Sequence, residues 1–199
     1  MFRTVTALAI SVILAVPALA QTAADPSKIE SGTYAVEPNH TQIVFGVSHF
    51  GFSIFHGTFS GLSGELSYDA KAPANSKLSV TIPMDKVATT SEKLTGELKD
   101  PDWFDAAKFP TATFKSTHIE VTSATTGKIT GDLTLHGVTK PITLDATFFG
   151  AGANPMSKIA TIGFSAKATV KRSDFGVAKY VPVVGDDVAL EISAPFEKR

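Results

Sequence analysis

The amino-acid sequence predicts an all-β protein whose strands form an antiparallel barrel of about eight strands. After Gln21, apolar residues recur at every second position, which is the period of a strand and not of a helix. Turn-forming segments such as "DAKAPANSK", "HGVTKP" and "VVGDD" separate these runs, at spacings typical of antiparallel sandwiches and barrels. A sheet of about eight antiparallel strands can close on itself, around either packed side chains or one small ligand.

The clearest strand is "TQIVFGVSHF", in which Ile43, Phe45, Val47 and His49 share one face and Phe50 falls on the other. Both faces of this run are largely apolar. Further alternating runs span residues 78–84, 112–114, 129–135, 142–148, 162–170 and 188–194.

One segment has a helical pattern, "SEKLTGELK" from Ser91 to Lys99. Ser91 is a good N-terminal cap, Gly96 weakens the helix, and Pro101 ends it. We therefore expect a short surface helix between strands.

The first twenty residues, "MFRTVTALAISVILAVPALA", are typical of a cleaved secretory signal. They carry one basic residue, Arg3, then an apolar run, and end in Ala18-Leu19-Ala20 before Gln21. The apolar run is shorter than the roughly 20 residues that a membrane span needs. We expect residues 1–20 to be the signal peptide and residues 21–199 to form a single domain in the periplasm, although a buried N-terminal helix is an alternative.

The charge balance is close to neutral. The chain has 18 Lys and Arg against 19 Asp and Glu, and loss of Arg3 with the signal leaves a net charge of −2. This balance provides no basic field for nucleic acid and no polybasic patch for anionic lipid heads. The absence of cysteine excludes disulfides, thiolate metal ligands and a cysteine nucleophile.

The five histidines, His40, His49, His56, His118 and His136, do not form a metal-binding motif. Zinc and iron sites usually leave a close pair such as H-x-H or H-x-x-x-H, and neither spacing occurs. We expect structural or rim histidines and predict no metal, no cofactor and no catalytic residue.

Other catalytic patterns also fit poorly. The segment "GLSGE" at residues 61–65 differs from the G-x-S-x-G nucleophile elbow and indicates a strand kink. The acidic segment "DPDWFD" lacks the ligand pattern of an EF-hand, and we expect a turn that packs Trp103 and Phe104 against the barrel. No phosphate-binding glycine loop is present.

Four segments together resemble the YceI-like family of secreted bacterial proteins, also described as periplasmic polyisoprenoid-binding or lipocalin-like. They are "YAVEPNHTQIVFGVSHFGFSIFHGTF", "WFDAAKFPTATF", "GDLTLHGVTKPITL" and "GFSAKATVKRSDFG". The resemblance implies an eight-stranded lipocalin-like barrel whose apolar cavity binds an isoprenoid or another long-chain amphiphilic lipid, with no catalytic residues.

The resemblance carries over to individual residues. His40 matches the histidine of an opening D-x-x-H pattern, although this chain has Glu37 where the family often has Asp. His49 matches the histidine that ends the first strand. Trp103 and Phe104 stand where the family usually has one aromatic residue. Arg172, Asp174 and Phe175 match the end of a late strand, with structural roles.

The candidate ligand-binding residues are large apolar side chains on the alternating runs or in the aromatic loop, together with two histidines. They are Phe45, Val47, His49, Phe50, Phe52, Phe55, His56, Phe59, Trp103, Phe104, Phe114, Leu133, Leu135 and Phe164.

The expected partner is a bound isoprenoid or fatty-acid-like lipid, held for transport, storage or sequestration, without nucleic acid or stable membrane insertion. Each buried methylene contributes about 0.8 kcal/mol, so a long chain provides ample binding energy. Two other functions stay open: a metal- or haem-dependent barrel enzyme that uses His49 and His56, and a ligand-free interaction module with a solid core. The sequence also leaves a homodimer open.

Overall fold

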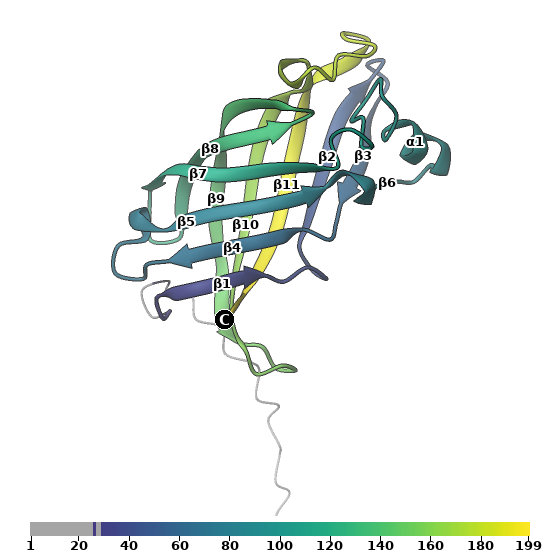
Figure 1. Ribbon diagram of the computed structural model, residues 1–199. Helices are drawn as coiled ribbons and strands as arrows, with labels where there is room; N and C mark the ends of the chain where they lie inside the picture. The colour runs from purple at the N-terminus through teal and green to yellow at the C-terminus, as the bar shows by residue number, and fades with distance from the viewer. Residues whose placement is uncertain (1–25, 27–28) are drawn as a thin grey trace, which may run out of the picture.

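The computed structural model describes residue 26 and residues 29–199. The predicted signal peptide therefore lies outside the described residues. Strands make up most of the described structure (Figure 1). They are β1 (Gly32–Val36), β2 (Gln42–His49), β3 (Ser53–Phe59), β4 (Ser63–Tyr68), β5 (Lys77–Pro83), β6 (Val87–Thr89), β7 (Thr111–Val121), β8 (Thr126–Leu135), β9 (Val138–Ala153), β10 (Ala160–Lys171) and β11 (Val184–Lys198).

Helical structure in the described part of the chain is limited to short pieces. The α-helix α1 spans Glu92–Glu97, and three single 3-10 turns are η2 (Pro73–Asn75), η3 (Met84–Lys86) and η4 (Arg172–Phe175). The amide of Leu94 donates a hydrogen bond to the Ser91 hydroxyl at 3.3 Å, so Ser91 caps α1 as expected.

Eight strands close into an antiparallel ring in the order β1-β4-β5-β7-β8-β9-β10-β11, and β11 pairs with β1 to complete it. The remaining strands β2, β3 and β6 continue from β11 as a side branch. Strand β11 pairs with β1 near its C-terminal end, through Phe196 to Lys198, and with β2 between Val184 and Ser193. The prediction of an eight-stranded antiparallel barrel with one short helix is confirmed.

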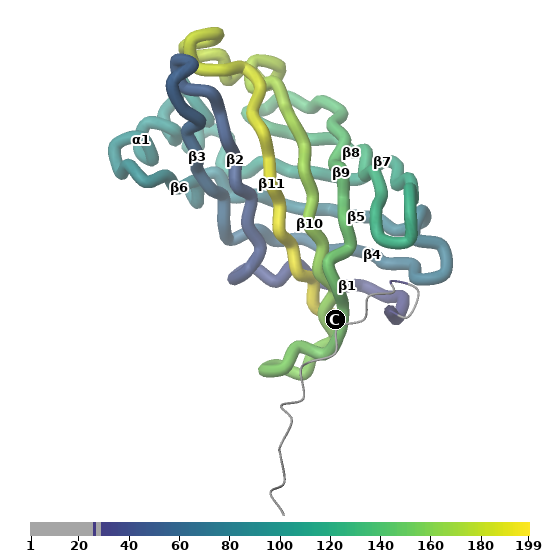
Figure 2. The backbone as a smooth tube through the Cα atoms, turned by 180° about the vertical axis from the view of Figure 1, so that it is seen from behind, coloured from purple at the N-terminus to yellow at the C-terminus, as the bar shows by residue number. Residues whose placement is uncertain are grey.

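The barrel is flattened into two layers that cross each other. In Figure 1, strands β1, β4, β5 and β7 run across the front while β9, β10, β11 and β2 run upward behind them. Figure 2, seen from behind, shows the second layer uncovered, with α1 and β6 at one edge beside β3.

The seven alternating runs identified in the sequence correspond to β2, β5, β7, β8, β9, β10 and β11. Strands β1, β3, β4 and β6 had no such run. Strands β1, β4 and β6 are short and place only a few apolar residues on the inner face, and β3 lies in the aromatic segment after Phe50. Tertiary context decides whether such short segments become strands.

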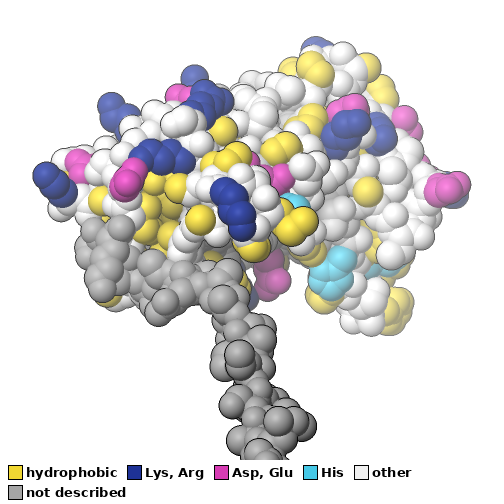
Figure 3. Space-filling view, turned by 90° about the horizontal axis from the view of Figure 1, so that it is seen from below, with side chains coloured by type: hydrophobic (Ala, Val, Ile, Leu, Met, Phe, Trp, Pro, Cys, Tyr) yellow, Lys and Arg dark blue, Asp and Glu magenta, His cyan; other side chains and the backbone are white. Residues whose placement is uncertain are grey.

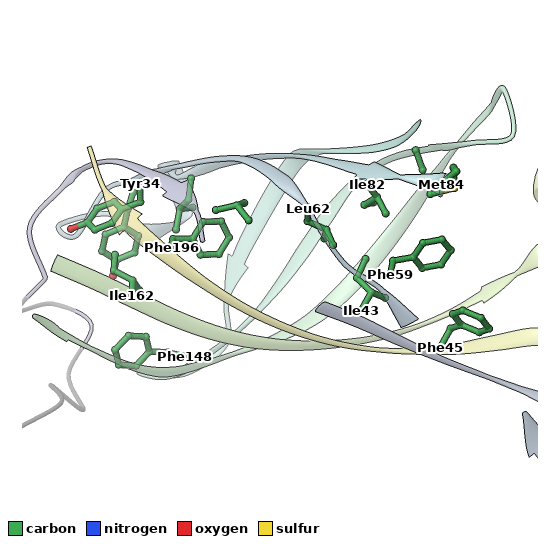
Figure 4. Close-up of a cluster of buried hydrophobic side chains, with 14 of the residues drawn as sticks. Tyr34, Ile43, Phe45, Phe59, Leu62, Ile82, Met84, Phe148, Ile162 and Phe196 are labelled. Atoms are coloured by element: carbon green, nitrogen blue, oxygen red, sulfur yellow. The ribbon is translucent and has the colours of Figure 1, made fainter. Parts of the chain in front are cut away.

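Two clusters of buried side chains cover the inner surface. One contains Tyr34, Ile43, Phe59, Ile162 and Phe196, which Figure 4 shows between the strand layers. The other is centred on strands β7 to β10 and contains Phe114, Leu133, Leu144, Ala146, Ala166, Val170 and Phe175.

Candidate functional site

The interior of the barrel encloses a cavity of about 490 Å³, a size typical of small-molecule sites. Its wall is built from inward side chains of strands in both layers, and these side chains are almost all apolar. The barrel interior is therefore hollow, a property that the two-residue period did not determine.

The cavity wall includes most of the predicted ligand-binding residues. These are Phe45, Val47, His49, Phe50, Phe55, Phe59, Trp103, Phe104, Phe114, Leu133, Leu135 and Phe164. The structure shows that these residues line the cavity, and their contact with a ligand stays a prediction.

Phe52 and His56, two further predicted ligand-binding residues, do not line the cavity, and their contact with a ligand stays a prediction. Phe52 lies at the tip of the β2–β3 hairpin with 91% of its surface exposed. His56 packs on the outer surface, where its ring lies beside Gly46. The aromatic composition of this segment indicated a cavity mouth but could not assign each side chain to a face.

His49 and His56 lie on opposite faces of the β2–β3 sheet. Register pairs His49 with Ser53 and Gly46 with His56, and side chains of paired residues share a face. His49 belongs to the inner face, and His56 belongs to the outer face with Gly46. The two rings therefore cannot coordinate the same metal ion.

Phe50 lines the cavity although its position in "TQIVFGVSHF" placed it on the opposite face from His49. Strand β2 ends at His49, and Phe50 has a φ of +55°, so strand alternation no longer applies to it. Its ring lies 4.1 Å from the His49 ring between centroids, half-exposed at one end of the cavity.

The turn after α1 adds an aromatic section to the wall. Phe104 packs edge-on against Phe59 with ring centroids 5.5 Å apart, and Phe59 in turn contacts Phe45 at 5.6 Å. Trp103 contacts Tyr180 edge-on at 6.1 Å. The turn "DPDWFD" therefore packs its two aromatic residues against the barrel, as the sequence predicted.

Buried polar side chains on the wall are Thr41, Ser76 and Arg172. The Arg172 guanidinium donates hydrogen bonds to the backbone oxygens of Gly185, Val177 and Val184 at 2.8, 2.7 and 2.8 Å. The Cζ atom of the Arg172 guanidinium also lies 5.6 Å from the centre of the Trp103 ring, a cation–π distance.

Sequence reasoning gave Arg172 a structural role and did not include it in the cavity. A signal was nevertheless present, because Arg172 has the same parity as the inward residues Ile162, Ala166 and Val170 of the preceding strand. A charged residue at an inward position of an apolar run is unusual and indicates either a partner or a function.

Among residue 26 and residues 29–199, no group of three or more His, Asp or Glu side chains is placed to hold a metal ion. In the same part of the chain, no helix has both the length and the apolar character needed to cross a membrane. Acidic and basic side chains alternate over the face shown in Figure 3 and do not gather into a patch of one sign.

A closed antiparallel barrel around an apolar cavity places the chain in the class of hollow antiparallel β-barrels. Within that class, the sequence matches the YceI-like domain family over residues 34–196, which include every barrel strand except the outer ends of β1 and β11. The chain belongs to this family.

Relatives of the chain include UPF0312 proteins of Pseudomonas. One from Pseudomonas savastanoi pv. phaseolicola is 40% identical over 141 residues, covering 71% of this chain and 73% of the relative. Another from Pseudomonas fluorescens is 39% identical over 158 residues, covering 78% and 82%.

Solved structures with the same fold include three that bear on this barrel. The YceI protein of Campylobacter jejuni is 33% identical, with a TM-score of 0.68 over 76% of this chain and 90% of its own. BcnA of Burkholderia cenocepacia has a TM-score of 0.72 at 24% identity, covering 80% and 98%. A polyisoprenoid binding domain from Saccharophagus degradans has a TM-score of 0.62 at 16% identity, covering 85% and 100%, so these last two show the fold alone.

Proposed function

We propose that this chain binds an isoprenoid or another long-chain amphiphilic lipid inside the barrel. The observation that carries the proposal is the cavity of about 490 Å³ with its almost entirely apolar wall. The description of the Saccharophagus degradans domain as polyisoprenoid-binding agrees with this class of ligand.

The physical chemistry of the wall favours a hydrocarbon chain over a polar ligand. A polar ligand would lose its hydrogen bonds with water at a cost of several kcal/mol and would find few partners on this wall. An alkyl or isoprenoid chain loses none, and each buried methylene contributes about 0.8 kcal/mol. Even after the entropy lost on binding, a chain of ten or more carbons retains a favourable free energy.

The biological setting is also part of the proposal. We propose that the protein works in the periplasm after removal of residues 1–20, and that it transports, stores or sequesters its lipid without chemical change. N-terminal sequencing of the purified protein tests the first point, with Gln21 expected as the first residue.

Native mass spectrometry of the purified protein, followed by organic extraction, tests lipid binding. The expected result is an added mass of a few hundred daltons that disappears on extraction and reappears in the extract as a lipid. If the bare polypeptide alone is found, and added long-chain lipids do not bind either, the protein is an interaction module. Chemical conversion of the extracted lipid on incubation with the protein would instead identify an enzyme.

A further inference from the structure

Exposed apolar side chains gather at one end of the barrel. In the described part of the chain, five of the nine large apolar side chains that stand exposed belong to the β2–β3 hairpin or to the loop that precedes β11. These five are Phe50, Phe52, Ile54, Tyr180 and Val183. Figures 1 and 2 show the hairpin and the loop together at the upper end of the molecule. We call residues 48–56 and 180–185 the apolar tip.

Backbone hydrogen bonds hold the two segments of the apolar tip together and in shape. The Phe50 amide donates to the Val183 oxygen at 2.9 Å, and the Val184 amide donates to the Tyr180 oxygen at 2.8 Å. Phe50 and Tyr180 have φ angles of +55° and +63°, a left-handed conformation that bulky residues rarely adopt. The fold therefore holds both aromatic rings at this end against the local preference of the backbone.

The apolar tip has no permanently charged side chain. Neither of its two segments contains Lys, Arg, Asp or Glu. At its border, the Lys179 ammonium forms an ion pair with the Asp102 carboxylate at 2.6 Å. A surface of exposed rings without charges loses few hydrogen bonds when it leaves water, and such patches mark interaction sites. The composition of the tip thus matches a hydrocarbon surrounding.

The apolar tip is also continuous with the cavity. Phe50 and Tyr180 line the cavity, and half or more of each side chain is exposed to solvent. A hydrocarbon chain that leaves the cavity over these two rings reaches the tip without being surrounded by water. A second exposed apolar group, at the β9–β10 turn, does not line the cavity; it comprises Phe149, Met156 and Ile159.

A lipid bilayer fits the apolar tip better than a folded partner. A stable protein–protein interface needs about 20–30 residues on each side, which is more than the two short segments provide. A projecting hairpin tip can instead enter the interfacial region of a bilayer, where aromatic side chains are favoured.

We infer that the apolar tip docks reversibly on the surface of a phospholipid bilayer, so that a lipid chain passes between the membrane and the cavity without crossing water. The passage rests on the proposed lipid-binding function, whereas docking itself is measured without a ligand in the cavity. The cavity wall supplies Phe50 and Tyr180 to both surfaces, and Phe52 belongs to the docking surface alone.

Co-sedimentation with sucrose-loaded vesicles of dioleoylphosphatidylcholine measures docking. The wild-type protein is expected to bind equally at about 50 mM and about 500 mM NaCl, because the tip has no charge for salt to screen. Phe52→Asn is expected to lower the partition coefficient about tenfold, since one fully exposed ring no longer enters the bilayer. Phe149→Asn is the matched control, because it makes the same change at a ring that is 85% exposed outside the tip, and it should dock as wild type.

A fluorescent label shows which end of the barrel touches the vesicle. The sequence has no cysteine, so a nitrobenzoxadiazole group on Ser53→Cys reports on the apolar tip alone. The same group on Met156→Cys reports on the exposed β9–β10 turn at the opposite end (Figure 1). Vesicles are expected to shift the emission of the Ser53 label to shorter wavelength and to leave the Met156 label unchanged. A shift of the Met156 label alone, or of both labels equally, overturns the inference.

Transfer of cis-parinaric acid, a fluorescent fatty acid, links docking to the cavity. Its rate of passage from the protein to vesicles that contain a quenching lipid is expected to rise with vesicle concentration and to fall about tenfold in Phe52→Asn. A rate that does not depend on vesicle concentration would show passage through water and overturn the inference.

The remaining outcomes separate docking from lipid binding. Wild-type protein that stays in the supernatant at both salt concentrations overturns docking, and so does a Phe52→Asn variant that binds vesicles as wild type does. A wild-type dimer in solution that Phe52→Asn dissociates would show that the tip joins two copies of the chain, which also overturns docking. Titration with cis-parinaric acid in the absence of vesicles tests the cavity by itself, so its failure would overturn the lipid-binding function and leave the vesicle result standing.

Discussion

At the scale of single residues, Gly57 explains how the largest ring on β2 fits into the wall. Gly57 pairs with Phe45, and a Cβ atom placed at Gly57 would lie 2.2 Å from the Phe45 ring and 2.9 Å from the backbone oxygen of Ala88. The missing side chain thus lets the Phe45 ring lie over Gly57 of the neighbouring strand. Without that space, the Phe45 ring or the backbone would have to move.

We predict that Gly57→Ala lowers the free energy of unfolding by about 1–3 kcal/mol, because a methyl group at this position overlaps both a ring and a backbone oxygen. Urea denaturation followed by circular dichroism measures the change. Gly96→Ala is the control, since a Cβ there meets nothing within 4 Å and favours the helix α1. Equal stability of Gly57→Ala and wild type would contradict this account of Phe45.

Two phenylalanines at the tip of the β2–β3 hairpin differ in their position relative to the cavity. Phe50 lines the cavity and is half-exposed, whereas Phe52, two positions along the same hairpin tip, lies almost fully in solvent. We predict that Phe50→Asn weakens binding of cis-parinaric acid by about 1 kcal/mol, roughly fivefold, since part of a ring leaves the ligand site. Phe52→Asn should leave the affinity within twofold of wild type. Loss of affinity in Phe52→Asn alone would place the binding site on the outer surface. Fluorescence titration distinguishes these results.

At the scale of elements, the corner between β1 and β2 is organised by Glu37. Its carboxylate, with 12% of the side chain exposed, accepts hydrogen bonds from the amides of Asn39 and His40 at 3.0 and 2.8 Å. The Asn39 side-chain amide and the His40 ring also contact it, at 2.9 and 2.7 Å. The E-x-x-H spacing that resembles the family pattern is therefore a turn that lets both strands reach the same edge of β11.

This corner makes the stability depend on pH. Burial by itself raises the pKa of the Glu37 carboxyl, but the bonds from Asn39 and His40 together outweigh burial and lower the pKa from its ordinary value of 4.5. A lowered folded-state pKa contributes stability that is present above the unfolded pKa and lost as the pH falls through the folded one.

We therefore predict that Glu37→Gln lowers the free energy of unfolding at pH 7 by about 1–2 kcal/mol, because the charged acceptor is lost. The difference from wild type should shrink as the pH falls below about 4.5. Urea titrations between pH 3 and 7 measure both effects. Glu65→Gln breaks an exposed ion pair with Arg199 and should change stability by about 0.5 kcal/mol or less. A pH-independent difference for Glu37→Gln would contradict the role of its charge.

At the scale of the whole molecule, the hollow interior depends on small side chains at inward positions, where larger side chains would fill the cavity. Ala146 of β9 and Ala166 of β10 are register partners, and both line the cavity. Larger residues at these positions would occupy the space that we assign to the lipid.

We predict that Ala146→Phe reduces lipid binding at least tenfold while the protein stays folded, since Ala146 borders the cavity and the added ring can occupy the free space there. Ala189→Phe is the matched control, because Ala189 is exposed on the outer face of β11. Probe titration and thermal unfolding are measured on both variants. If Ala146→Phe binds cis-parinaric acid as well as wild type, the ligand does not use this part of the cavity.

Much of the cavity wall could be predicted because a strand has a fixed period of two. Once Phe45 is placed inward, Val47 and His49 follow, and the same logic places Leu133 with Leu135. The position of His56 could not be predicted, because the face of β3 depends on its register with β2. The exposure of Phe52 could not be predicted either, because a hairpin tip does not follow the alternation.

The sequence by itself determined the strand class, which residues of each long run share a face, and the cap of α1 at Ser91, because these depend on local backbone geometry. Only the tertiary structure decided that the ring closes through β1 and β11, since these strands come from opposite ends of the chain. It also decided that the interior is hollow, because the free volume depends on how far closure holds the two layers apart. Arg172 became part of the cavity for the same reason: its three backbone partners lie up to 13 residues further along the chain, and folding alone brings them to the cavity's end.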